Sequence, residues 1–202
     1  FASLKKDTES QISTYPFKEL QSKTYGKHEG EIIVLKARRG VGKTELFRAM
    51  EHHDLKTTDI SIGVIHLEED NWTTVKAIAG YELGIPAVLP DCGLSDEDIM
   101  EGYRKAVKDD ENRVHIYTSF DKEDEEKLYN NVRFLRAVGC RGIYLDHITW
   151  LATGKDDEDE RRKLDRISQN LKLLAKELRI FICEISHVNA QGGSRGSANI
   201  EN

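Results

Sequence analysis

The sequence has little of what builds disulfide-linked, metal-binding or membrane proteins. Only three of its 202 residues are cysteines, Cys92, Cys140 and Cys183, and their wide spacing matches no metal-binding motif. No apolar run approaches the roughly 20 residues of a membrane-spanning helix, and no secretory leader follows Phe1. Cys183 lies in an apolar run, so we expect it to be buried and reduced. These absences predict a cytoplasmic protein without a membrane segment.

Charge is abundant, but neither sign dominates. Charged residues make up 33% of the chain and hydrophobic residues 38%, and the formal net charge is −6. A chain of this length and composition can bury one sizeable core, which predicts one globular domain. A negative net charge argues weakly against nucleic-acid binding, which favours basic surfaces. It does not exclude such a partner, because a ring-shaped assembly can confine its basic groups to a channel.

From Gly30 onward, apolar strand patterns alternate with amphipathic helix patterns. The predicted strands are 31–36, 61–67, 114–117, 142–145 and 179–185. The predicted helices are 43–53, 71–81, 95–108, 122–138 and 158–178. This alternation predicts an α/β fold with a mainly parallel, twisted sheet that carries helices on both faces. Residues 1–29 are polar and irregular, and we interpret them as an N-terminal linker or docking arm ahead of a main domain over 30–202.

The loop between the first strand and the first helix has a phosphate-binding pattern. Residues 37–44 fit G-x-x-x-x-G-K-[ST], except that alanine stands where the first glycine is usual. The loop residues are Ala37, Arg38, Arg39, Gly40, Val41, Gly42, Lys43 and Thr44. Its glycines let the backbone wrap N–H groups around a phosphate chain, Lys43 would reach the β- and γ-phosphates, and Thr44 would offer its hydroxyl to Mg²⁺. The alternative is a glycine-containing turn that carries Lys-Thr by chance.

Two acidic residues follow apolar strands, at the edge where such sheets bind their ligands. Glu68 follows the second strand and can orient and deprotonate an attacking water, although residues 68–70 could equally cap the next helix. Asp146 follows the fourth strand, and with a phosphate loop upstream we expect it to hold Mg²⁺ together with Thr44, directly or through water. The alternative for Asp146 is a strand-terminal residue that accepts hydrogen bonds from loop amides.

The fifth strand leads to His187 and then to a loop too rich in Gly, Ser and Asn to pack. His187 could sense the terminal phosphate, but a lone histidine at a strand end is more often structural. Residues 188–197 offer backbone N–H groups, small hydroxyls and one arginine, which suit contacts to phosphates. A plain flexible loop is the competing interpretation, and composition does not decide between the two.

Taken together, these segments resemble the RecA-like motor domain of DnaB-family replicative DNA helicases, a P-loop NTPase core. Within that family they are most similar to the branch of phage helicase-primases and mitochondrial Twinkle. The resemblance covers most of the chain and is carried by 37–44, by 64–69, by 144–149 with 159–165, and by 185–189 with 195–202. The Asp-His strand end, the helix that follows it and a histidine in the sensor position are features of this branch.

The resemblance implies a role for each matching residue. Lys43 and Thr44 correspond to the phosphate-loop lysine and the Mg²⁺-binding hydroxyl, and Glu68 to the glutamate that activates water. Asp146 corresponds to the aspartate of the Mg²⁺ shell, and His187 to the γ-phosphate sensor. The implied site therefore contains a base, a metal ligand and a sensor around one phosphate.

The resemblance also implies partners. The loops after His147 and over 188–197 correspond to loops that grip single-stranded DNA. The expected DNA contacts are Asn189, Gly192, Gly193, Arg195, Gly196 and Ser197. The implied protein is a DNA helicase that moves 5′–3′ as a homo-oligomeric, hexameric ring, hydrolyses ATP or another NTP or dNTP, and meets other replisome proteins in the cytoplasm, the host's if it is phage-encoded. The alternatives are a RecA-type recombinase and a nucleotide-gated DNA-binding or loader module with little turnover.

Several features depart from the family pattern. Ala37 replaces a glycine, and Arg38 and Arg39 stand where small residues are commoner, either to add phosphate contacts or to face a neighbour. The family's last strands and its arginine finger would lie beyond Asn202, so we expect a complete active site only with a neighbouring subunit. A start at Phe1 without methionine indicates a fragment or a processed chain, and we find no primase-like or zinc-binding segment.

Overall fold

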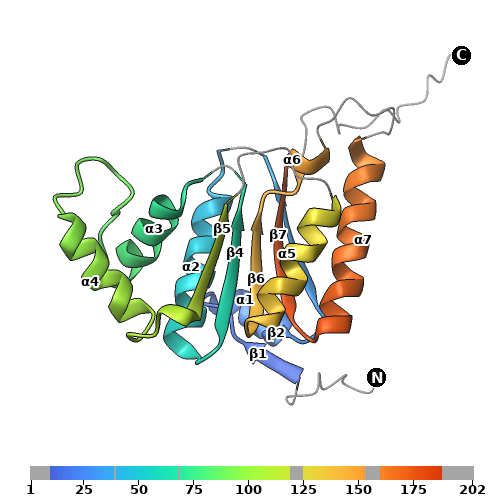
Figure 1. The fold of residues 1–202 in the computed structure, drawn as a ribbon, viewed down its shortest axis with the longest axis horizontal. Coiled ribbons are helices and arrows are strands. Elements are labelled where there is room, and N and C mark those ends of the chain that lie inside the picture. The colour runs from blue at the N-terminus through green and yellow to red at the C-terminus, as the bar shows by residue number, and fades with distance from the viewer. Residues whose placement is uncertain (1–9, 39, 68, 119–124, 153–159, 188–202) are drawn as a thin grey trace, which may run out of the picture.

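A five-stranded parallel sheet organises the chain (Figure 1). The computed structural model describes residues 10–38, 40–67, 69–118, 125–152 and 160–187. The strands are β3 (Ile32–Ala37), β4 (Ser61–His66), β5 (Val114–Thr118), β6 (Cys140–Asp146) and β7 (Phe181–His187), in the order β3-β7-β6-β4-β5. Every neighbouring pair of these strands is parallel. The five strands expected from the sequence are therefore present, each displaced by at most a few residues.

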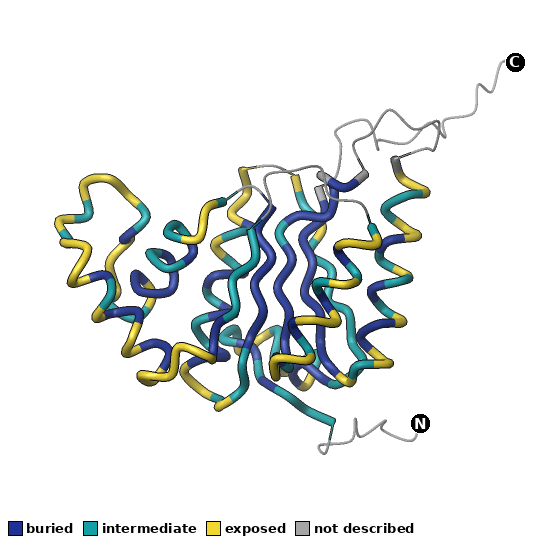
Figure 2. Tube along the Cα trace, in the orientation of Figure 1, coloured by how far each residue is buried: buried dark blue, intermediate teal, exposed yellow. Residues whose placement is uncertain are grey.

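Helices cover both faces of this sheet, which confirms the predicted α/β architecture. α2 (Lys43–Thr57), α3 (Asn71–Leu83) and α4 (Asp96–Ala106) lie on one side in Figure 1, and α5 (Glu125–Ala137) and α7 (Glu160–Leu178) lie on the other. Alternate residues of each strand feed the two cores: Ile62 and Val64 of β4 pack with α2 and α3, whereas Ile65 packs with α5 and α7. Figure 2 shows the resulting buried strands between half-exposed helices.

Local signals explain where two of these helices begin. Ser95 caps α4 by accepting from the N–H of Asp98, and the Asp98 carboxylate accepts from the N–H of Ser95 in return. Asp70 caps α3 by accepting from the N–H of Thr73 at 2.7 Å. Acidic caps of this kind were one interpretation of residues 68–70, and Asp70 has that role.

The N-terminal region contains elements that the sequence pattern did not predict. β1 (Gln11–Ser13) pairs with β2 (Lys27–His28) in an antiparallel ladder, and α1 (Lys18–Thr24) lies between them in the chain. These elements pack against the core that α2 and α3 share with the sheet, and Lys27 is fully buried there. The strands have only three and two residues, so they leave no alternation to recognise. The division into an arm and a motor domain at residue 29 stays a prediction.

Two further short elements were not predicted, α6 (Thr149–Ala152) and a 3₁₀ turn over Glu111–Arg113. All three cysteines are free, and Cys140 and Cys183 are buried, as expected for Cys183. Among the helices that the structure describes, none is both long and apolar enough to cross a membrane.

Candidate nucleotide site

The order of the strands places several predicted site residues next to one another. β7 lies between β3 and β6, and Ala37 at the end of β3 is in register with His187 at the end of β7. On the other side of β6, His66 at the end of β4 is in register with Asp146. Because these strands are parallel, the phosphate loop, Asp146 and the segment after β4 meet at the same edge of the sheet.

The backbone of the phosphate loop has the form that a phosphate cradle needs. Gly40 and Gly42 have positive φ angles of 77° and 87°, which side chains other than glycine rarely adopt. A Cβ at either position would meet no atom within 4 Å, so the space around the loop is open. Gly42 is the N-cap of α2 and supplies no side-chain cap, which leaves N–H groups of the first turn available to an anion.

The alanine at the first position of the loop has a simple structural explanation. Ala37 is the last residue of β3 and pairs in register with His187. Positive φ angles among the described non-glycine residues occur at four positions only, and Ala37 is not one of them. Extended backbone accepts a Cβ without strain, so this position has no need of glycine.

Lys43 is the first residue of α2 and is buried, with 8% of its surface exposed. Its ammonium donates to the carbonyl oxygens of Ala37, at 2.9 Å, and Arg38, at 2.7 Å. Both acceptors are neutral groups of the loop itself. A phosphate oxygen is a stronger acceptor for an ammonium than a neutral carbonyl, so the lysine is placed to exchange these contacts for an anion.

Thr44 and Asp146 meet although they are far apart in the sequence. The Thr44 hydroxyl donates to Asp146 Oδ2 at 2.8 Å. Burial raises the pKa of Asp146, against the opposing effect of the Thr44 hydrogen bond. A hydroxyl beside a carboxylate is a donor set that suits Mg²⁺, which keeps water and phosphate oxygens as its remaining ligands. The described residues contain no cluster of three or more His, Cys, Asp or Glu side chains that could hold a metal ion.

A buried polar network adjoins this pair, and the sequence analysis did not anticipate it. His66 accepts or donates a 2.9 Å hydrogen bond with the Thr74 hydroxyl and lies 3.6 Å from carboxylate oxygens of both Glu51 and Glu69. Burial alone would lower the pKa of His66, but the carboxylates of Glu51, Glu69 and Asp146 together outweigh burial and raise it. Arg48 joins the network through Glu69, at 2.7 Å. One indication of this network is present in the sequence: Arg48 follows Thr44 by four residues, which places both on the same face of the predicted helix.

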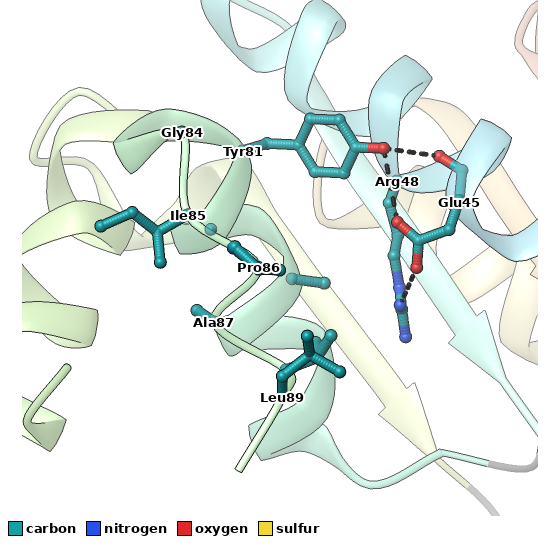
Figure 3. Close-up of a pocket in the computed structure, with 11 residues that line it drawn as sticks. Glu45, Arg48, Tyr81, Gly84, Ile85, Pro86, Ala87 and Leu89 are labelled. Atoms are coloured by element: carbon teal, nitrogen blue, oxygen red, sulfur yellow. Dashed lines mark hydrogen bonds and ion pairs between the residues drawn. The ribbon is translucent and has the colours of Figure 1, made fainter. Parts of the chain in front are cut away.

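A pocket of about 450 Å³ lies beside this network, between α2, α3 and the residues that follow α3 (Figure 3). Glu45 and Arg48 form one rim, where the Tyr81 hydroxyl donates to the carbonyl oxygen of Glu45 at 3.0 Å. The opposite wall is apolar and includes Ile85 and Leu89. Figure 3 shows Arg48 and Tyr81 reaching Glu45 from two different helices.

Some predicted residues lie outside what the structure describes. They are Glu68, Arg39 and the six expected DNA contacts, Asn189, Gly192, Gly193, Arg195, Gly196 and Ser197. His187 is the last residue of β7, but its side chain is also outside the described part. Their roles stay predictions.

Comparison with known proteins agrees with this arrangement. The model of the DnaB-like helicase C-terminal domain matches residues 12–199. The chain is 26% identical over 174 residues to the DNA helicase/primase of Enterobacteria phage T3, and 26% identical over 192 residues to the replicative DNA helicase DnaB of Leifsonia xyli subsp. xyli. These alignments cover 84% and 86% of the chain but only 30% and 38% of the relatives. The chain thus spans about a third of the length of these relatives.

Solved structures show the same fold. A DnaB-like replicative helicase, described with its interactions with primase, superimposes with a TM-score of 0.71 at 20% identity, over 91% of this chain and 45% of that one. The ATPase domain of G40P superimposes with a TM-score of 0.69 at 18% identity, over 91% of this chain and 67% of that one. At these identities the likeness concerns the fold.

Proposed function

Because the chain belongs to the DnaB-like helicase C-terminal domain family, we propose that it is the ATPase motor of a replicative DNA helicase. The motor would couple ATP hydrolysis to movement along single-stranded DNA and to unwinding of the duplex. The observation that carries the proposal is the meeting of Thr44 with Asp146 at 2.8 Å beside an open, glycine-containing loop that ends in Lys43. The names of the relatives, replicative helicases and a helicase/primase, support the same function.

The residues at the sheet edge divide the chemistry among them. The loop N–H groups and the Lys43 ammonium would bind the β- and γ-phosphates and position them in line with an attacking water. Thr44 and Asp146 would hold Mg²⁺, which neutralises developing charge on the phosphates when it is bound. Glu68, the residue after Leu67 of the β4 segment, would accept the proton of the attacking water. His187, at the end of β7, would contact the terminal phosphate and respond to its loss.

The DNA-facing part of the proposal rests on the family. Residues 188–197 directly follow His187, so movement at the phosphate can pass to the expected DNA contacts along one continuous segment. Hydrolysis at subunit interfaces of a hexameric ring, 5′–3′ movement, contacts to other replisome proteins and a cytoplasmic location belong to the same proposal. These four features are proposed from the family and do not depend on the geometry of the site described above.

The direct test is ATP hydrolysis by the full-length protein as the assembled oligomer. We expect turnover to rise when single-stranded DNA is added, because the sensor and the DNA loop are contiguous in the chain. Turnover that ignores DNA in an assembled ring would contradict the helicase assignment. Open filaments instead of rings in electron micrographs would favour the recombinase, and tight ATP binding with negligible turnover would favour the nucleotide-gated module.

A further inference from the structure

An ion pair joins the helix of the phosphate loop to the segment that follows β4. Arg48 lies one turn after Thr44 on α2 and is only 6% exposed. One guanidinium nitrogen, Nη2, lies 2.7 Å from Glu69 Oε1, and the other, Nη1, donates to Glu45 on the same helix (Figure 3 shows the Glu45 side). An arginine clamped between two carboxylates has little freedom to turn, so Glu69 is fixed relative to α2.

The residues on both sides of Glu68 are therefore tied to the two elements that carry the nucleotide site. On the amino side, Leu67 is buried and its N–H donates to the carbonyl oxygen of Asp146 at 2.9 Å. On the carboxyl side, Glu69 is held by Arg48, and Asp70 then caps α3. The residue before Glu68 is thus bonded to the strand that ends in Asp146, and the residue after it is paired with the helix that carries Lys43 and Thr44.

The surroundings of the ion pair make this link stiff. His66 lies 3.6 Å from Glu69 on one side and 3.6 Å from the fully buried Glu51 of α2 on the other, and it also bonds to Thr74 of α3. Glu69 is consequently in contact with groups from α2 and from the end of β4. The Arg48 side chain is only 8% exposed, so the ion pair with Glu69 is favoured, because a largely buried charge that loses a partner is strongly disfavoured.

We propose that Arg48 is a positioning residue for ATP hydrolysis, which holds Glu68 at the correct distance from the γ-phosphate through its ion pair with Glu69. The inference rests on the proposed function, since it takes Glu68 to be the water-activating base. Arg48 itself need touch neither nucleotide nor water. A positioning role predicts a loss of turnover without a loss of nucleotide affinity, because the binding groups Lys43 and Thr44 stay in place.

The test measures ATP turnover and binding of a fluorescent ATP analogue with the full-length oligomer. We expect Arg48→Met to lower kcat by about 10²-fold, the effect of a displacement near 1 Å, while KM for ATP and the dissociation constant of the analogue change by less than about twofold. Arg48→Lys keeps the charge but not the two-pronged geometry, so its kcat should lie in between. Arg141→Met is the matched control, since it breaks another arginine–glutamate pair, with Glu29, at the end of β6 opposite to Asp146, and its kcat should stay close to wild type.

A double variant separates positioning from general damage to the fold. If Arg48 acts through Glu68, then Arg48→Met should cause no further loss of kcat when it is added to Glu68→Gln. A full additional loss in that background, or a wild-type kcat in Arg48→Met, would overturn the inference while leaving the proposed function intact. Full hydrolysis by Glu68→Gln alone would instead overturn the proposed role of Glu68 and the inference with it. Should Arg48→Met fail to fold, Glu69→Gln breaks the same pair from its more exposed side, and a wild-type kcat there would equally contradict the inference.

Discussion

Two buried lysines, Lys43 and Lys27, lie near opposite ends of α2, and they bind different kinds of acceptor. Lys43 opens α2, and its ammonium donates to two backbone carbonyls of the phosphate loop. Lys27 comes from β2 and donates to Asp54 near the other end of α2, at 2.5 Å, and to the hydroxyl of Tyr144 in β6, at 2.9 Å. At about 1.5 Å per residue, Lys43 and Asp54 are roughly 16 Å apart along the helix axis.

This difference indicates that Lys27 is a structural anchor, fixed by a buried ion pair, whereas Lys43 is a poised lysine, free to bind a ligand. Asp54 accepts from Lys27, from Tyr144 at 2.6 Å and from Ser13, so the charges around Lys27 are matched within the protein. Aromatic rings add to this, with the Lys27 ammonium 5.1 Å from the centre of the Phe181 ring. Within the described part of the chain, the acceptors of Lys43 are neutral carbonyls, which an anionic phosphate can replace. The same side-chain type therefore stabilises the fold at one site and is available for binding at the other.

Removal of the poised lysine should have the largest effect on activity. We expect Lys43→Ala to reduce ATP turnover by about 10³-fold or more, because charge on the transferring phosphoryl group loses its main side-chain partner. Thermal unfolding followed by circular dichroism should change little, since the hydrogen bonds of Lys43 among the described residues go to carbonyls of the loop. The exposed Lys36 of β3 provides the control, and Lys36→Ala should keep its turnover. Substantial turnover in Lys43→Ala would contradict the site assignment.

Removal of the anchored lysine should show the reverse pattern. Lys27→Met leaves Asp54 buried without its counter-charge, so the free energy of unfolding should fall by about 3–5 kcal/mol. Urea unfolding measures this loss. Lys56→Met, which removes an exposed partner of Glu82, should cost no more than about 1 kcal/mol.

A double variant of Lys27 and Asp54 tests whether the unpaired charge causes the loss of stability. Replacing both members of the pair, Lys27→Met with Asp54→Leu, should recover part of the lost stability, because no unpaired charge then remains although the hydroxyls of Tyr144 and Ser13 lose Asp54 as an acceptor. If Lys27→Met alone leaves the unfolding free energy within about 1 kcal/mol of wild type, the contrast between the two lysines is wrong.

Glu184 is another buried ionisable residue, and its protonation should make the stability of the protein depend on pH. It lies in β7, its carboxylate accepts from the Ser168 hydroxyl at 2.7 Å, and burial raises its pKa to about 7. The folded protein therefore binds this proton more tightly than the unfolded chain, and stability should fall as pH rises from about 4.5 to about 7. Glu184→Gln should be within about 1 kcal/mol of wild type at pH 5 and more stable by about 3 kcal/mol at pH 8. Urea unfolding at both pH values tests this, and an equal difference at the two would contradict it.

A conservative substitution in the Thr44–Asp146 pair should change activity less than the substitutions above. Thr44→Val removes the hydroxyl and keeps the shape, so the Mg²⁺ concentration for half-maximal turnover should rise by about tenfold, as expected for a lost metal contact. A titration of Mg²⁺ at saturating ATP measures it. Thr57→Val, at the exposed end of the same helix, is a matched control that should leave the Mg²⁺ requirement unchanged. An unchanged requirement in Thr44→Val would separate this hydroxyl from the metal.

The sheet and its ligand-binding edge could be predicted from the sequence, because both depend on patterns within short, contiguous segments. Each strand after Gly30 is rich in apolar residues, and the phosphate loop is a contiguous motif, so both can be recognised without knowledge of the fold. The buried ion pair of Lys27 and Asp54 could not be predicted, because these residues and Tyr144 meet only once the chain has folded. Arg48 and Glu69 likewise come from different elements. The departure at Ala37 could be explained only from the structure, which places that residue in β3 rather than in the turn.

The central claim is that Lys43, Thr44 and Asp146 form the nucleotide-binding part of a helicase motor. A structure of the full-length oligomer with a non-hydrolysable ATP analogue, Mg²⁺ and single-stranded DNA tests it most directly. The account predicts that the Lys43 ammonium leaves the carbonyls of Ala37 and Arg38 for the β- and γ-phosphates, with Mg²⁺ held between Thr44 and Asp146. Nucleotide bound at another place, with Lys43 still on the loop carbonyls, would contradict it.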